Sequence, residues 1–104
     1  MINNKKIIDS MEMIRIFTQN GASPNLDEYW DVIVKELSKN IKETEEYLNE
    51  CDKEKLELIS QCFDDIAYNF KDKKFIDILM DLEKKYKGID ISREIEWAKQ
   101  AIED

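Results

Sequence analysis

Histidine is absent from all 104 residues of the chain. Its absence removes the commonest general base, the Ser-His and Cys-His nucleophile pairs, and the usual Cys/His zinc sites. The chain has only two glycines, too few for a glycine-rich loop around a phosphate. Asp64 and Asp65 are adjacent, and on a helix they point about 100° apart and do not face each other as paired catalytic carboxylates do. We therefore expect no enzymatic activity, no cofactor and no metal site.

Glycine and proline are scarce throughout, with two glycines and one proline. This scarcity favours helices joined by short connections. Hydrophobic residues make up 42% of the chain, which is typical of a globular protein, and no run alternates with a period of two for long enough to indicate a strand. Residues 1–104 are therefore predicted to form a single all-α domain, a compact bundle of four to five antiparallel helices.

Helical spacing of apolar residues delimits five segments. The second and third are the longest. Ser38 and Asn40, which disfavour a helix interior, lie within the second, and both a continuous helix and a bend or break at this point are left open. The segments cover residues 4–19, 25–51, 53–70, 73–86 and 91–103.

Helix ends are marked by polar residues and glycine. Asn25 followed by Glu28 has the spacing of a capping box, after a loop over residues 19–24. Asp52 and Asp72 are predicted N-caps, and Gly88 is predicted at the end of the fourth helix.

Cysteine is limited to Cys51 and Cys62. Cys62 lies on or beside an apolar stripe, where a small buried thiol is more common than a disulfide partner. No signal peptide and no apolar run long enough to cross a membrane is visible. We therefore expect free thiols and a cytoplasmic location.

The chain has 16 basic and 24 acidic residues, which gives a net charge of −8. Residues 25–52 carry nine acidic and three basic side chains, and residues 53–70 carry four and two, so residues 25–70 hold a charge of −8. Such a chain lacks the dense basic patch that nucleic acid or an anionic membrane requires. The acidity favours a cationic protein partner, or serves solubility alone.

The acidic residues lie away from the predicted core. If residues 53–70 form one helix, Glu57, Gln61, Asp64 and Tyr68 project between about 80° and 140° from Leu56, and the core stripe lies near 320°. Tyr68 thus either anchors a partner among acids or packs against a neighbouring helix. The predicted partner-binding residues are Asp27, Glu28, Asp31, Glu46, Tyr47, Glu50, Glu57, Gln61, Asp64, Asp65 and Tyr68.

Trp97 also falls outside the apolar stripe of its helix. Two placements are open for it. We favour packing beneath the N-terminus of the chain over exposure to a partner.

The stretch from Leu56 to Ile102 resembles the small helical immunity proteins of bacterial polymorphic-toxin and contact-dependent growth inhibition systems. The resemblance lies in the helix LELISQCFDDIAYNF, a Lys/Asp turn, KFIDILMDLEKKY, a Gly-Ile-Asp connection and ISREIEWAKQAI. It is a pattern of apolar spacing with acidic decoration over roughly the C-terminal half. It implies that the chain binds one cognate toxin domain, often a basic nuclease, and blocks it without doing chemistry.

Two other classes of function remain open. One is a helical adaptor or regulatory module that binds a cytoplasmic protein. The other is a structural subunit or homodimer built on apolar residues such as Met13, Ile16 and Trp97. The free protein is expected to be a monomer or a weak dimer.

Overall fold

A computed structural model describes residues 2–19 and 26–103. That part of the chain contains seven helices and no strand, which confirms the all-α class. The expected number of four to five helices is wrong, because two of the five predicted segments are each divided into two helices. The helices are α1 (Asn4–Gln19), α2 (Asp27–Leu37), α3 (Ile41–Glu50), α4 (Lys53–Ser60), α5 (Phe63–Phe70), α6 (Lys73–Lys85) and α7 (Ser92–Glu103).

The first division, between α2 and α3, falls at residues 38–40, so of the two alternatives left open there the structure has the break. The Asn40 side chain accepts a hydrogen bond from the backbone N–H of Glu43 at 3.0 Å and so caps α3. The buried Thr44 hydroxyl donates to the Leu37 carbonyl oxygen at 2.6 Å. The break is therefore stable because side chains satisfy backbone groups at both helix ends.

The second division, between α4 and α5, was not predicted. Buried Ser60 donates its hydroxyl to the Glu57 carbonyl oxygen at 2.5 Å, and buried Cys62 donates its thiol to the Ile59 carbonyl oxygen at 3.1 Å. Such local bonds from side chain to backbone compete with the helical ladder. Residues 53–70 are consequently not one helix, and the stripe drawn from Leu56 does not run through to Tyr68.

Other predicted helix ends are confirmed. Asp52 accepts from the backbone N–H of Lys55 at 2.8 Å, and Asp72 accepts from that of Lys74 at 2.9 Å. Gly88 lies in the turn after α6 with a φ of +86°, a conformation that favours glycine. The Asn25 capping box and most of the loop over residues 19–24 lie outside the described residues.

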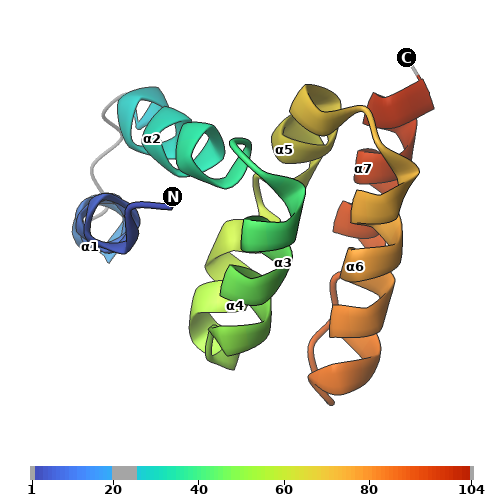
Figure 1. Cartoon of the computed structure of the whole chain (residues 1–104). Coiled ribbons are helices and arrows are strands. Elements are labelled where there is room, and N and C mark those ends of the chain that lie inside the picture. Colours follow the sequence, from blue (N-terminus) through green and yellow to red (C-terminus); the bar gives the residue numbers. More distant parts are fainter. Residues whose placement is uncertain (1, 20–25, 104) are drawn as a thin grey trace.

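The helices form two packed groups joined through α3 and α5 (Figure 1). At one end α1 packs on α2, and at the other α6 and α7 run antiparallel. The short α5 packs most closely against α7, and each contributes a fully buried alanine, Ala67 and Ala98, whose small side chains permit this approach. Phe63 and Phe75 meet edge to face in the core, with ring centroids 6.2 Å apart.

Glu36 is a charged residue inside the structure, with 3% of its surface exposed. Its carboxylate accepts from the backbone N–H of Asn3 at 2.9 Å and from Lys39 Nζ at 3.0 Å. These hydrogen bonds hold the pKa of Glu36 below its usual value, and the bond from Asn3 has the larger effect. Glu36 thereby ties the start of α1 to the end of α2.

The C-terminal end of α3 is held by residues from the end of α6. The Tyr86 hydroxyl donates to the carbonyl oxygens of Asn49, at 3.2 Å, and of Cys51, and Lys85 Nζ donates to the Asn49 carbonyl oxygen at 2.7 Å. Carbonyl groups left free by the end of a helix are thus satisfied. These contacts fasten α3 to α6.

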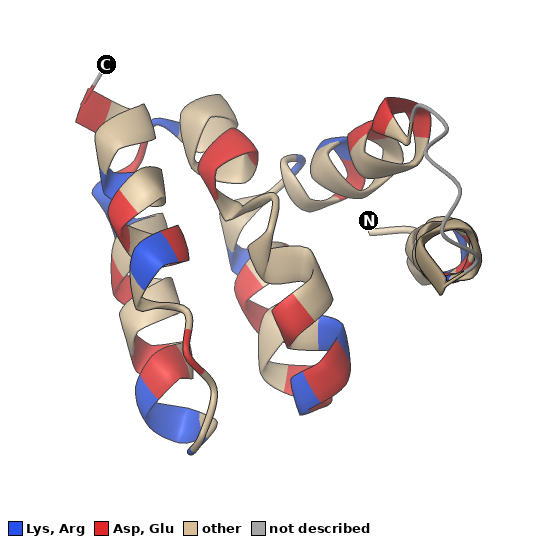
Figure 2. Ribbon diagram, turned by 180° about the vertical axis from the view of Figure 1, so that it is seen from behind, with Lys and Arg blue, Asp and Glu red and all other residues tan. Residues whose placement is uncertain are grey.

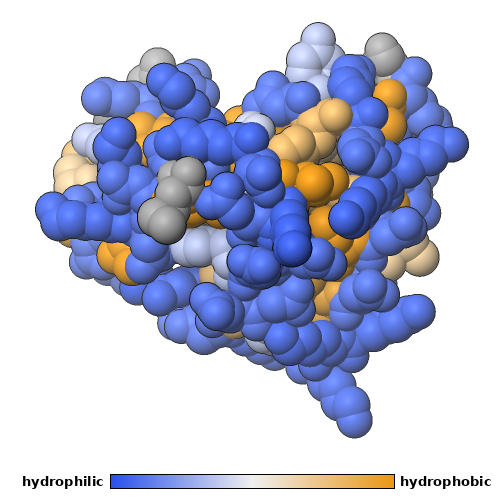
Figure 3. All heavy atoms as spheres, in the orientation of Figure 1, coloured by the Kyte–Doolittle hydropathy of each residue, from blue (hydrophilic) through white to orange (hydrophobic). Residues whose placement is uncertain are grey.

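Both cysteines are free and buried, as predicted. Burial raises the pKa of Cys51 to about 11 and raises that of Cys62 further. Within residues 2–19 and 26–103, no helix has the length and apolarity needed to cross a membrane. The face in Figure 3 is mainly hydrophilic, with apolar side chains visible in a band between α3 and α6.

Candidate functional site

The predicted partner-binding residues all lie at least partly on the surface, but the structure does not bring them together. Seven of the eleven line three separate hollows, whereas Asp27, Glu28 and Asp31 lie on α2 and Glu46 lies on α3. The division follows from the two helix breaks, because each break changes the direction in which the next helix presents its outer face.

The first hollow lies between α5 and α7 and has a volume of about 510 Å³. We call it the α5–α7 hollow. Tyr68 on α5 is 57% exposed, and Trp97 on α7 is 46% exposed. The lining residues are Asp64, Asp65, Tyr68, Trp97, Gln100 and Ala101.

The local sequence of α5 dictates this arrangement. Phe63, Ile66 and Ala67 are fully buried, so the intervening Asp64 and Asp65 face outward. Both aspartates occupy the first turn of α5, where the helix dipole favours negative charge. The outer surface of α5 is therefore acidic at its start and aromatic one turn later.

A third carboxylate, Asp31 on α2, adds its charge to this region. Burial raises the pKa of Asp65, and the negative charges of Asp64 and Asp31 raise it further. Figure 2 shows the acidic segment of α5 between α7 and α2. The charges of Asp64 and Asp31 thus both repel that of Asp65, and a cation placed beside Asp65 would relieve that repulsion.

Each of the two exposed aromatic rings makes a cation–π contact with a basic side chain of the same protein. Lys71 Nζ lies 4.3 Å from the centroid of the Tyr68 ring, and the Arg93 guanidinium carbon lies 5.0 Å from that of Trp97. Lys71 also donates to the Ala101 carbonyl oxygen at 2.8 Å. The expectation that Trp97 packs beneath the N-terminus is wrong, because its ring is exposed beside Tyr68.

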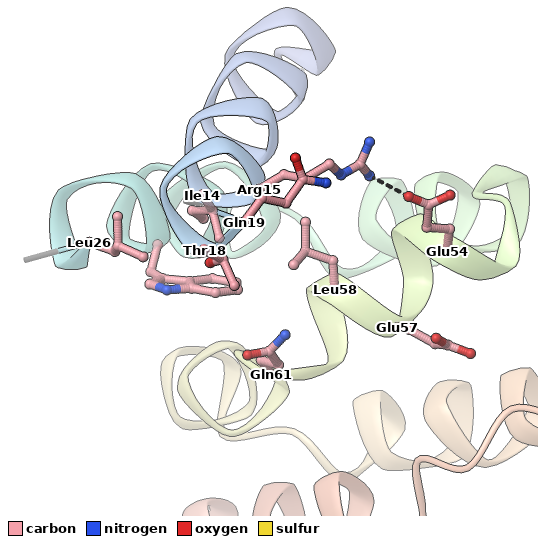
Figure 4. Close-up of a pocket in the computed structure, with 10 residues that line it drawn as sticks. Ile14, Arg15, Thr18, Gln19, Leu26, Glu54, Glu57, Leu58 and Gln61 are labelled. Atoms are coloured by element: carbon pink, nitrogen blue, oxygen red, sulfur yellow. Dashed lines mark ion pairs between the residues drawn. The ribbon is translucent and has the colours of Figure 1, made fainter. Parts of the chain in front are cut away.

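The second hollow lies among α1, α2 and α4, with a volume of about 560 Å³, and we call it the α1–α4 hollow. It is lined by Ile14, Arg15, Thr18, Gln19, Leu26, Trp30, Glu54, Glu57, Leu58 and Gln61. Figure 4 shows Arg15 reaching from α1 to Glu54 on α4, an ion pair of 2.8 Å, above Leu58. Two predicted residues, Glu57 and Gln61, therefore line a different hollow from Asp64, which follows Gln61 by only three positions.

The third hollow, of about 280 Å³, lies at the end of α3 and contains the predicted residues Tyr47 and Glu50. Tyr47 is half-buried, and its hydroxyl donates to Asn4 Oδ1 at 2.7 Å. Burial raises the pKa of Tyr47 to about 12. Tyr47 thus joins α3 to α1, whereas Tyr68 projects from the surface.

The remaining predicted residues are exposed away from these contacts. Asp27 and Glu28 occupy the first turn of α2, where they complement the helix dipole, and Glu46 lies on the surface of α3. The structure does not place them in a hollow.

No protein-family model, no curated protein and no solved structure matches the chain. In the part of the chain that the structure describes, no three Asp, Glu or Cys side chains are grouped so that they could hold a metal ion. What the α5–α7 hollow offers is recognition: two exposed aromatic rings and two carboxylates.

Trp97 is the residue of this surface that the prediction missed. Its position outside the apolar stripe was a usable signal, because a large aromatic residue outside the core stripe has to be covered by another element or exposed. Helical spacing within α7 does not decide between these two placements, because the outcome depends on how α5 packs beside Trp97.

Proposed function

We propose that the chain is an immunity protein that binds a cognate cationic toxin domain in the cytoplasm of the producing cell and neutralises it. The resemblance of Leu56–Ile102 to such proteins motivates the proposal. The observation that carries it is the pairing of exposed Tyr68 and Trp97 with Asp64 and Asp65 in one hollow.

The physical roles of these groups differ. The net charge of −8 attracts a cationic partner over distances comparable to the Debye length, about 8 Å at physiological ionic strength. The aromatic rings act at contact, because a tyrosine or tryptophan buries a large area at a modest cost in side-chain entropy. Inhibition then follows from occlusion of the toxin's cationic active cleft.

The proposed interface is centred on Asp31, Asp64, Asp65, Tyr68 and Trp97. Asp27 and Glu28 lie one helical turn before Asp31, at the start of α2, and contribute to attraction rather than contact. Glu46, Tyr47 and Glu50 lie on α3, which packs against α6, and are assigned no contact with the toxin.

A helical adaptor is the second candidate. Its supporting observation is the α1–α4 hollow, whose apolar side chains Ile14, Leu26, Trp30 and Leu58 are of the kind that receive an amphipathic helix. In that case a change at Leu58 should weaken binding of the partner helix, and a change at Asp64 should leave that binding unaltered.

Co-expression tests the proposal. The first step is to read the frame directly upstream of this gene, where the proposal expects a toxin domain. That domain is the probe, and it is produced in a host that it kills. The chain is expected to restore growth, and Asp64→Lys/Asp65→Lys to lose most of the protection. Asp77→Lys/Asp81→Lys, with the same charge change on exposed α6 positions, is the matched control and should protect normally. Failure of the wild-type chain to protect would refute the immunity function.

A further inference from the structure

Asp64 and Asp65 have no counter-ion in the part of the chain that the structure describes. Other carboxylates do: Glu54 pairs with Arg15 at 2.8 Å and Glu36 with Lys39 at 3.0 Å. Lys71, whose Nζ lies over the Tyr68 ring, donates to the Ala101 carbonyl oxygen and to neither aspartate. The α5–α7 hollow thus combines two unpaired carboxylates with two aromatic rings.

We propose that the α5–α7 hollow receives an arginine side chain of the partner, whose guanidinium stacks on an aromatic wall and pairs with the carboxylates. The identity of the partner as a toxin rests on the proposed function, but the arginine specificity does not.

Guanidinium fits this lining better than ammonium does. It is planar, so it can stack on the ring of Tyr68 or Trp97, and its forked donors match a carboxylate in a bidentate pair. It is also less strongly hydrated than the lysine ammonium and costs less to place in a partly enclosed hollow. Arg93 over Trp97 shows within the chain itself that this ring accepts a guanidinium, at 5.0 Å.

The attraction between the hollow and a cation has two sources. Asp64 and Asp65 line the hollow, and the charges of Asp64 and Asp31 repel that of Asp65, so an incoming positive charge is attracted to this site. The exposed ring faces add a cation–π contribution. An uncharged side chain of the same shape gains from neither source and should not bind.

Three short peptides test the proposal without any toxin: acetyl-Gly-Arg-Gly-amide and its lysine and citrulline counterparts. Each is titrated into the full-length protein labelled with ¹⁵N. The readout is the indole N–H resonance of Trp97, with that of Trp30 in the α1–α4 hollow as an internal control.

The arginine peptide is expected to shift the Trp97 resonance with a dissociation constant on the order of millimolar, and to leave Trp30 unmoved. The lysine peptide should bind at least about threefold more weakly, since it cannot stack as a plane. The citrulline peptide should cause no shift. Asp64→Asn/Asp65→Asn should abolish the response, and Asp77→Asn/Asp81→Asn should retain it.

Equal shifts from arginine and lysine, any comparable shift from citrulline, or no shift of Trp97 would overturn the proposal. If the double variant loses its native spectrum, Asp65→Asn alone replaces it, and an unchanged response there would count against the proposal. The peptide result is independent of co-expression. A protein that binds the arginine peptide without protecting against the toxin refutes the immunity function alone. One that protects without binding the peptide refutes only the arginine site.

Discussion

Replacing Tyr68 with alanine should weaken toxin binding while leaving the fold nearly intact. A tyrosine side chain presents about 200 Å² of surface. Because Tyr68 is 57% exposed, about 115 Å² of that surface remains for a partner to bury. At about 25 cal/mol per Å² this area corresponds to ~3 kcal/mol, and the cost of ordering the side chain reduces it to ~2 kcal/mol.

A loss of ~2 kcal/mol corresponds to about a thirtyfold weaker complex. It should appear mainly as faster dissociation, because contacts made after encounter act on the off-rate. The free protein loses the exposed cation–π contact with Lys71, worth ~0.5–1 kcal/mol, so its melting temperature should fall by about 4 °C or less. Binding kinetics with immobilised toxin domain and a thermal melt measure the two effects.

Tyr47→Ala is the matched control, because Tyr47 is a tyrosine whose hydroxyl is already bonded to Asn4. Its removal should lower the melting temperature and leave toxin dissociation unchanged. The reasoning is refuted if Tyr68→Ala destabilises the fold strongly while the affinity stays the same. Tyr68 would then be a packing residue.

Three further predictions concern stability. Asp65→Asn should weaken toxin binding, and urea titration at neutral pH should show a stability that is unchanged or higher. The reason is that the pKa of Asp65 is raised in the folded protein, so its contribution to stability is present at low pH and is lost as pH rises through the pKa of the folded state. Glu36→Gln should lower the free energy of unfolding by ~1–2 kcal/mol in the same assay, because it weakens the charged hydrogen bonds to Asn3 and Lys39. The pKa of Glu36 is lowered in the folded protein, so its contribution to stability is present above the pKa of the unfolded state and is lost as pH falls through the pKa of the folded state. The stabilities of wild type and variant should therefore converge in acid. Tyr86→Phe should cost ~1–2 kcal/mol, because carbonyl oxygens at the end of α3 lose their donor.

Local signals in the sequence were enough to predict much of the fold. Asp52 and Asp72 cap helices because a short acceptor side chain bonds a backbone N–H two or three residues ahead, which requires no distant partner. Ser38 and Asn40 marked the place where a break between α2 and α3 was one of two alternatives, because both residues disfavour a helix interior. Periodicity of apolar residues likewise predicted α1 with its observed bounds.

Features that depend on distant residues were not predictable in this way. The break between α4 and α5 depends on buried Ser60 and Cys62 bonding their own backbone, and nothing in the spacing of apolar residues reveals their burial. Tyr47 and Tyr68 both lie outside an apolar stripe, and only the approach of Asn4 on α1 distinguishes the bonded tyrosine from the exposed one. Candidate residues assigned from one helix at a time were therefore divided among several hollows.

The dependence of the toxin association rate on salt tests the central claim most directly. For the wild-type chain we expect a rate that falls at least about tenfold between 50 and 500 mM salt, because exposed charges are screened over a shorter distance. Asp64→Lys/Asp65→Lys should associate about tenfold more slowly at low salt with a shallower dependence, and Asp77→Lys/Asp81→Lys should keep most of the wild-type rate. A thermal melt of each variant accompanies the measurement, since reversing charge at the start of α5 costs ~1 kcal/mol. An association rate that is insensitive to salt, or equal in the two charge-reversed variants, would contradict the claim that the acidic surface around the α5–α7 hollow binds a cationic toxin.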